Sequence, residues 1–131
     1  TGDLAVADLP AAWNENTHKY LGIRPTDDRT GCLQDIHWAA GYVGYFPTYS
    51  LGNLVAAMLW DRLQIDIPDL QAGLSAGHTK PILDWLKDKV HRHASFYGPV
   101  ELLKKSLDMQ LDHRPFMNYL NNKFRPLYGL S

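Results

Sequence analysis

The sequence predicts an all-α protein: one helical domain over residues 1–131, with a single long irregular segment inside it. In most of the chain, apolar residues recur at the spacing of a helix, and short turns marked by proline or glycine separate these stretches. The exception is residues 23–49, where no long regular helix fits. With 131 residues, 45% of them hydrophobic, the chain is long enough for one core and too short for two ordinary domains.

The first helix is expected to begin near Asp8 and to run to Leu21. Asp8 is a suitable N-terminal cap, and Pro10 suits the first turn, where its missing N–H costs nothing. Gly22 is expected to close the helix. A buried stripe is predicted from the residues that recur at helical spacing, which are Trp13, Thr17, Tyr20 and Leu21.

The irregular segment, Ile23 to Tyr49, holds five glycine or proline residues and five large aromatic residues. A structureless stretch of this length inside a small domain is uncommon and is often functional. We expect one short strand inside it, from Cys32 to Trp38. The aromatic residues favour a core, although tyrosines in a polar loop also suit a binding site because each buried hydroxyl needs a partner.

Further helices are predicted after this segment. Their expected ranges are 50–66, 69–76, 79–90, 100–111 and 115–126. The predicted inward-facing residues of the first and third of these helices are Leu51, Leu54, Val55, Met58, Leu59 and Leu63, and Ile82, Leu83, Trp85, Leu86 and Val90. Short turns join them, so we expect a helical bundle with one elaborate loop.

Composition argues against two classes of partner and suggests a compartment. The net charge is −1 and the thirteen Lys and Arg residues are scattered, whereas a nucleic-acid surface needs a clustered basic face. No apolar run approaches the roughly 18 residues of a membrane helix. The one cysteine, Cys32, cannot form an intramolecular disulfide, and no signal peptide is visible, so a cytoplasmic location is predicted. Cys32 itself is expected to be a small buried residue rather than a nucleophile.

The six histidines are the obvious metal candidates, but their spacing gives no support to a site. A helical zinc motif needs two histidines four residues apart on one face, and none are so spaced. His91 and His93 are two apart, about 200° around a helix, and so could not bind one ion together from a helix. His37 lies beside Gln34 and Asp35, and two interpretations stay open: a structural histidine held by Asp35, or a site residue.

The sequence of residues 31–38, Gly-Cys-Leu-Gln-Asp-Ile-His-Trp, resembles the Gly-x-x-Gln-Asp-x-His-Trp motif of the carboxypeptidase Taq family of zinc metallocarboxypeptidases. Residues 44–54 resemble a second stretch of that family, Gly-Tyr-Phe-Pro-x-Tyr-x-Leu-Gly-Asn-Leu. The resemblance extends to both ends of the chain, through Asp8-Leu9-Pro10, Trp13-Asn14, Tyr20-Leu21-Gly22 and Leu127-Tyr128-Gly129-Leu130.

This resemblance implies a fold of long helices around a deep groove, with zinc at its base, and removal of residues from peptide C-termini. The family's His-Glu-x-x-His motif and its carboxylate-binding arginine precede every residue present here. The chain would therefore be the C-terminal part of a larger helical metallopeptidase, with the zinc ligands in the N-terminal part of the same enzyme. The expected partners are that N-terminal part and a peptide C-terminus. The chain alone is expected to bind no cofactor and to be inactive.

The resemblance also implies roles for individual residues. His37 and Tyr49 would be hydrogen-bond donors to the oxyanion of the tetrahedral intermediate, and Asp35 would orient His37 through its other ring nitrogen. Gln34 would hold the substrate backbone or the loop. Tyr42 and Tyr45 are expected near the C-terminal end of the substrate. For Gln34 and Trp38 a purely structural role, joining the loop to the neighbouring helices, is the favoured alternative.

Two alternatives to an enzyme fragment stay open. A stand-alone, non-catalytic helical binding module derived from the same scaffold would have a polar surface all round. The enzyme fragment would expose an apolar face where the remainder packs, and such a patch favours self-association, so a homodimer is a further hypothesis. An independent metal site built on His37 lacks support from the histidine spacing.

Overall fold

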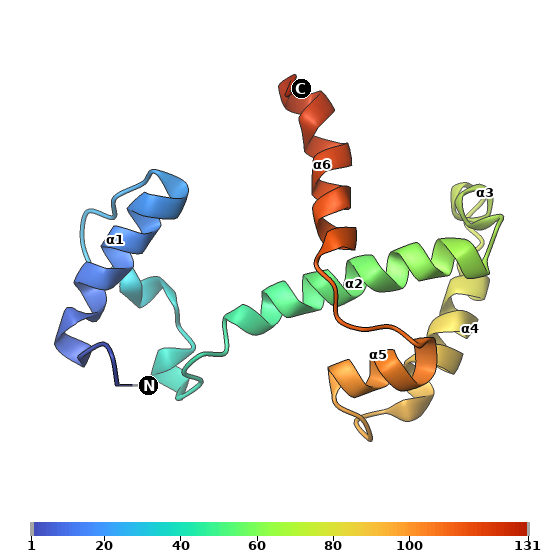
Figure 1. Cartoon of the computed structure of the whole chain (residues 1–131), viewed down its shortest axis with the longest axis horizontal. Helices are drawn as coiled ribbons and strands as arrows, with labels where there is room; N and C mark the ends of the chain where they lie inside the picture. The colour runs from blue at the N-terminus through green and yellow to red at the C-terminus, as the bar shows by residue number, and fades with distance from the viewer. Residues whose placement is uncertain (1, 131) are drawn as a thin grey trace. The chain divides into compact units, whose positions relative to one another are not determined.

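The computed structural model describes residues 2–130, and over that range it contains six α-helices, four short 3-10 helices and no strand (Figure 1). The all-α prediction is therefore confirmed. The chain divides into two compact units, residues 1–47 and residues 48–131. The single domain over residues 1–131 stays a prediction.

The first unit begins with a 3-10 turn, Val6–Asp8, which leads into helix α1, Leu9–Leu21. Gly22 ends α1 as predicted: it adopts a left-handed φ of 72°, and its N–H donates to the His18 carbonyl at 2.9 Å. Asp8 occupies the N-cap position as predicted, but its side chain does not cap the helix. Asp8 has helical backbone angles, φ −90° and ψ −6°, whereas a capping residue is normally extended, and its side chain makes no capping hydrogen bond.

The predicted buried stripe of α1 is only partly correct. Trp13 and Thr17 are half-buried, and Trp13 packs edge-on against Trp38 with ring centroids 5.7 Å apart. Tyr20 and Leu21, in contrast, are 72% and 69% exposed. The reason is the small interior of this unit, which offers little to cover the last turn of α1. Within residues 2–47 the buried residues are Gly31, Cys32 and Asp35.

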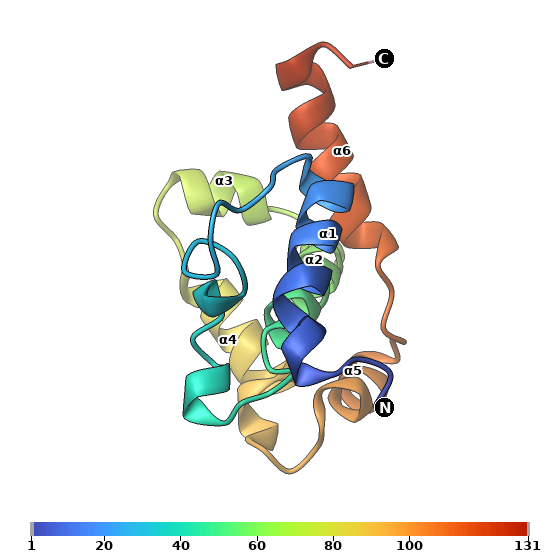
Figure 2. The ribbon, with the colours of Figure 1, turned by 90° about the vertical axis from the view of Figure 1, so that its left-hand side faces the viewer.

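The chain after α1 folds back beside the helix, as both views of the ribbon show (Figures 1 and 2). The predicted strand from Cys32 to Trp38 is wrong, because 3-10 turns form at Cys32–Gln34 and Trp38–Ala40. A lone strand would leave its backbone groups without partners. The turns satisfy them locally: the Leu33 N–H donates to the Asp28 carbonyl at 2.9 Å.

The second unit is built of longer helices. In chain order they are α2 (Pro47–Asp66, beginning at the boundary of the units), α3 (Leu70–Ser75), α4 (Lys80–Lys89), a 3-10 turn (His91–His93), α5 (Pro99–Leu107) and α6 (Arg114–Tyr128). The helices predicted at 50–66, 69–76 and 79–90 are confirmed to within three residues at each end.

The last two helices end where the sequence did not predict. α5 stops four residues before the expected Leu111, because Asp108 adopts a left-handed φ of 51° and turns the chain. α6 passes through Pro126 to Tyr128, although Pro126 was expected to stop it. A proline in the last turn removes only one backbone hydrogen bond, and Gly129, with φ 63°, provides the actual end.

A single hydrophobic cluster joins α2, α3, α4 and α5. Its buried members are Met58, Leu63, Leu70, Trp85, Leu103 and Leu107. Among the predicted inward-facing residues, Val55, Leu59, Ile82 and Leu86 pack against this cluster. Leu51 and Leu83 are exceptions, 46% and 57% exposed.

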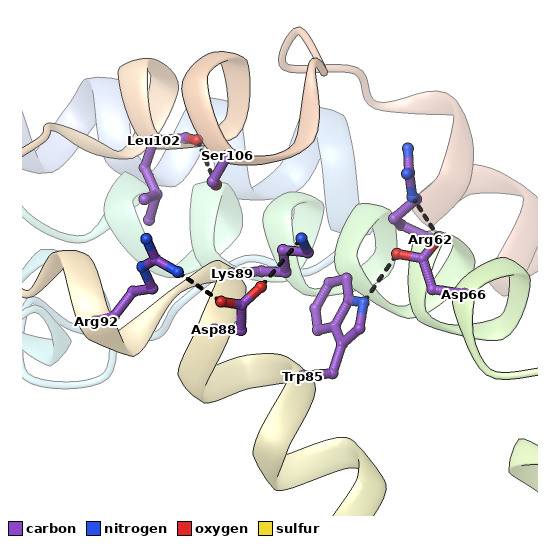
Figure 3. Close-up of polar contacts among 8 residues, drawn as sticks. All are labelled: Arg62, Asp66, Trp85, Asp88, Lys89, Arg92, Leu102 and Ser106. Atoms are coloured by element: carbon purple, nitrogen blue, oxygen red, sulfur yellow. Dashed lines mark hydrogen bonds and ion pairs between the residues drawn. The ribbon is translucent and has the colours of Figure 1, made fainter.

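Polar contacts join the same helices at the edge of this cluster (Figure 3). The Trp85 indole N–H of α4 donates to an oxygen of Asp66, the last residue of α2, at 2.8 Å. Arg62, one turn earlier, donates to the other oxygen at 3.0 Å. The indole hydrogen bond is the main reason that the pKa of Asp66 lies below its usual value, and Arg62 adds to the effect. Trp85 therefore contributes both apolar area and a directed hydrogen bond.

The first turns of α6 lie against the middle of α2 (Figure 1). A hollow of about 320 Å³ lies between the two helices, lined by Ala57, Trp60 and Phe116 among others. Apolar side chains of α6 remain exposed beyond this point, including Leu127 and Tyr128 at 70% and 73%. No helix within residues 2–130 has the length and apolar character needed to span a membrane.

Candidate active site

Asp35 is the one buried charged or polar residue among residues 2–130, with 8% of its surface exposed. A buried carboxylate is costly unless it is paired and hydrogen-bonded. Both conditions are met by His37, whose backbone N–H donates to Asp35 Oδ1 at 3.0 Å and whose ring Nδ1 lies 2.6 Å from the same oxygen. The prediction that Asp35 contacts a ring nitrogen of His37 is confirmed.

The contact at Nδ1 determines how the His37 ring can act. A carboxylate only accepts hydrogen bonds, so the proton between the two groups is assigned to Nδ1. Any proton or hydrogen bond that this ring exchanges with another molecule then involves Nε2. The contact thus holds the ring at Nδ1 and leaves Nε2 on its other side.

Aromatic rings enclose the imidazole of His37, whose side chain is 17% exposed. The centroid of the Tyr45 ring lies 5.1 Å from that of the His37 ring, in a tilted arrangement. The centroid of the Phe46 ring lies 5.5 Å from it, edge-on. Tyr42 is the next ring outward, 5.7 Å from Tyr45. The structure thus brings three predicted residues, His37, Tyr42 and Tyr45, into one aromatic cluster. Phe46 was counted in the sequence only as one of the aromatic residues of this segment, and nothing in the sequence indicated its contact with His37.

Backbone geometry explains how Tyr42 and Tyr45 reach this position. The His37 carbonyl accepts hydrogen bonds from the N–H groups of Ala40 at 3.1 Å and Tyr42 at 2.9 Å. Gly41 adopts a left-handed φ of 79° at the end of the second 3-10 turn and reverses the chain. Tyr42 consequently follows the turn immediately, and a further hydrogen bond from the Tyr45 N–H to the Tyr42 carbonyl, 3.2 Å, continues the bend.

The remaining predicted residues have different surroundings. The Gln34 side-chain amide donates to the Arg29 carbonyl at 2.6 Å, which supports the structural alternative for this residue. Trp38 packs on Trp13 of α1. Tyr49 lies in the first turn of α2, 55% exposed and beyond the boundary of the first unit, so its pairing with His37 stays a prediction.

The described residues do not fit a metal centre. No three His, Cys, Asp or Glu side chains within residues 2–130 are placed to hold an ion. Asp35 and His37 supply two donor groups that already bind each other. His91 and His93 lie in a 3-10 turn rather than a helix, and His93 contacts the Tyr97 ring at 5.6 Å. A metal at this site would need ligands from other residues.

Several known proteins are similar in sequence to nearly the whole of this chain. The family described as carboxypeptidase Taq (M32) metallopeptidase matches residues 1–124. Carboxypeptidase 1 of Bacillus subtilis is 42% identical over 130 residues, which are 99% of this chain and 26% of that protein. Thermostable carboxypeptidase 1 of Pyrococcus furiosus is 42% identical over 122 residues, 93% of this chain and 24% of that protein.

Solved structures agree in fold as well as in sequence. The M32 carboxypeptidase from Deinococcus radiodurans R1 superposes with a TM-score of 0.89 at 34% identity, over 98% of this chain and 26% of that one. The Pyrococcus furiosus carboxypeptidase structure gives a TM-score of 0.88 at 41% identity, over 95% and 25% of the two chains. The chain therefore spans about a quarter of the length of these relatives. On the family match and these identities, the chain belongs to the carboxypeptidase Taq (M32) metallopeptidase family.

Proposed function

We propose that this chain is the C-terminal part of a zinc-dependent metallocarboxypeptidase that releases single residues from peptide C-termini. The observation that supports this most directly is the Asp35–His37 pair: a buried carboxylate 2.6 Å from an oriented imidazole, within the part of the sequence that resembles the family motif. Family membership supports the reaction class. The zinc would be held by residues outside this chain, because the donor groups described here do not form a metal site.

In this proposal His37 stabilises negative charge. Hydrolysis of a peptide bond passes through a tetrahedral intermediate that carries an oxyanion, and directed donors lower its energy. For this role the ring carries both protons, with Nδ1–H on Asp35 and Nε2–H directed at the oxyanion. Tyr49 is proposed as the second donor, through its phenolic O–H. Tyr42 and Tyr45 would contact the C-terminal residue of the substrate, because they extend the aromatic cluster outward from His37.

The apolar side chains exposed on α6 support the fragment over a stand-alone binding module, which predicted a polar surface all round. We infer that the N-terminal part of the same enzyme covers them. A homodimer and a cytoplasmic location remain predictions of the sequence.

The test is a carboxypeptidase assay of the full-length enzyme that contains this chain. Release of the C-terminal residue from a peptide should stop on chelation, return with zinc and be absent for the amidated peptide. His37→Gln should lower kcat by about 100- to 1000-fold, the usual effect of losing one oxyanion donor. His93→Gln, in the 3-10 turn after α4, is the matched control and should leave kcat unchanged. Equal activity of the two variants would remove His37 from the proposal.

A further inference from the structure

Two contacts hold the loop that carries His37, residues 31–38, against α1. They lie on either side of the Asp35–His37 pair in the sequence. Trp38, which follows His37 directly, packs edge-on against Trp13 at 5.7 Å. Gly31, four residues before Asp35, is buried where the loop passes Asn14, the next residue of α1. Trp13 and Asn14 are adjacent, so one turn of α1 supports both ends of the segment that carries the pair.

A side chain at Gly31 would be in tight contact with its neighbours. A Cβ atom there would lie 3.0 Å from the Asp27 carbonyl oxygen, 3.2 Å from Asn14 Oδ1 and 3.3 Å from Pro25 Cβ. The nearest of these atoms belongs to the backbone of Asp27, within the loop itself, whereas the α1 atom lies at the end of the Asn14 side chain. Replacing Gly31 by alanine would therefore require an adjustment of a few tenths of an ångström, in the loop backbone at Asp27 and at the Asn14 side chain of α1.

We propose that Trp13 and the Asn14–Gly31 contact are positioning elements for His37, and this inference rests on the function proposed above. The physical reason is the scarcity of other supports. Within residues 2–47 no hydrophobic cluster comparable to that of the second unit exists, so a rigid helix must define where the loop lies. His37 has to direct Nε2 with an accuracy of a fraction of an ångström, and a small displacement lowers the rate strongly.

The test compares Trp13→Leu, Trp13→Phe and Gly31→Ala in the full-length enzyme. Trp13→Leu removes the ring that meets Trp38, whereas Trp13→Phe keeps an aromatic edge. We expect Trp13→Leu and Gly31→Ala to lower kcat by about 10- to 100-fold, the range for groups that orient an active residue, with KM little changed. Trp13→Phe should recover most of the loss.

Trp85→Phe is the control for a general loss of stability. Trp85 belongs to the hydrophobic cluster of the second unit, so its replacement should lower the melting temperature and leave kcat unchanged. The downfield proton NMR signal expected from the short Asp35–His37 hydrogen bond supplies a readout that a structural role alone would not move. It should shift or broaden in Trp13→Leu and Gly31→Ala, and remain in Trp85→Phe.

A double variant separates the two proposals. In the His37→Gln background, Trp13→Leu should cause no further loss of kcat, because the residue through which Trp13 acts is already gone. A full additional loss would overturn the positioning role. If His37→Gln itself left kcat unchanged, the proposed function would fail. If His37→Gln lowered kcat while the signal and kcat survived in Trp13→Leu, the inference about α1 alone would fail. Should Trp13→Leu not yield folded enzyme, the NMR signal and kcat of Gly31→Ala decide the question.

Discussion

The irregular segment of the first unit and the helices of the second are stabilised in different ways. The second unit buries six large apolar side chains from four helices in one cluster. Residues 23–46 bury almost none, and rely instead on local turns, one buried carboxylate and contacts with α1. Within this chain, apolar packing and the buried Asp35–His37 pair thus lie in different segments. Apolar packing tolerates little polarity, so polar groups that must be oriented and reached by a substrate are held by hydrogen bonds on a segment outside the core.

The comparison can be tested most strongly in the core. Leu103 in α5 is 2% exposed, and Leu103→Ala should lower the free energy of unfolding by about 2–5 kcal/mol, because the cavity left behind adds to the lost burial. Leu83→Ala, at a site 57% exposed, should change it by about 0.5 kcal/mol or less. Denaturant unfolding of the full-length enzyme measures both. Similar losses for the two variants would mean that the cluster around Leu103 is not the core.

A second prediction concerns a residue whose replacement should lower turnover without lowering stability. Tyr49→Phe removes one hydroxyl from a residue that is 55% exposed, so unfolding should change little. If Tyr49 donates to the oxyanion, kcat should fall by about 100-fold. Tyr20→Phe, at an exposed tyrosine of α1, provides the matched control. Unchanged turnover in Tyr49→Phe would exclude this residue from the proposed donor pair.

A third prediction tests strain in the loop between α4 and α5. Ala94 adopts φ 46° and ψ −129°, a conformation that glycine reaches without the steric cost of a Cβ atom. Ala94→Gly should therefore stabilise the enzyme by about 1 kcal/mol. Ala56→Gly, inside α2, should have the opposite sign and cost about 0.5–1 kcal/mol. Thermal unfolding distinguishes them, and destabilisation by both would refute the strain at Ala94.

The smallest expected effect is a pH dependence at the start of α6. Hydrogen bonds from the Arg114 side chain and backbone N–H lower the pKa of Asp112 from 3.8 to about 2. A lowered pKa stabilises the folded state above the unfolded value, and this contribution is lost as the pH falls from about 4 through about 2. Asp112→Asn should reduce stability at neutral pH, and the difference should shrink as the pH falls through about 2. A constant difference between the two proteins over this range would contradict the assignment.

The sequence predicts the helices well where the signals are local. Gly22 ends α1 and the apolar spacing of α2 identifies its buried face at Met58 and Leu63. Prediction fails where the burial of a residue or the end of a helix depends on the surrounding structure. Tyr20 has the right spacing to be buried, but nothing in the small first unit covers it. Pro126 is a helix breaker in isolation, yet in a last turn it costs one hydrogen bond.

The candidate site likewise contains contacts that can be predicted from the sequence and contacts that cannot. Asp35 and His37 are two residues apart, so their contact follows from local geometry and could be predicted. The Phe46 and Tyr45 rings reach His37 only because Gly41 reverses the chain, and the contact of Trp13 with Trp38 joins residues far apart in the sequence. Such contacts depend on the folded path of the loop, which has no periodicity to reveal it.

We propose that the Asp35–His37 pair acts as one unit in peptide hydrolysis. The most direct measurement is a double-mutant cycle on kcat in the full-length enzyme, using Asp35→Asn and His37→Gln. Asp35→Asn keeps the shape of the side chain and removes its charge, and should lower kcat by about 10- to 100-fold through the orientation of His37. If the pair acts as one unit, Asp35→Asn should have no further effect on kcat once His37 is glutamine. Additive losses, or full activity of either single variant, would contradict it.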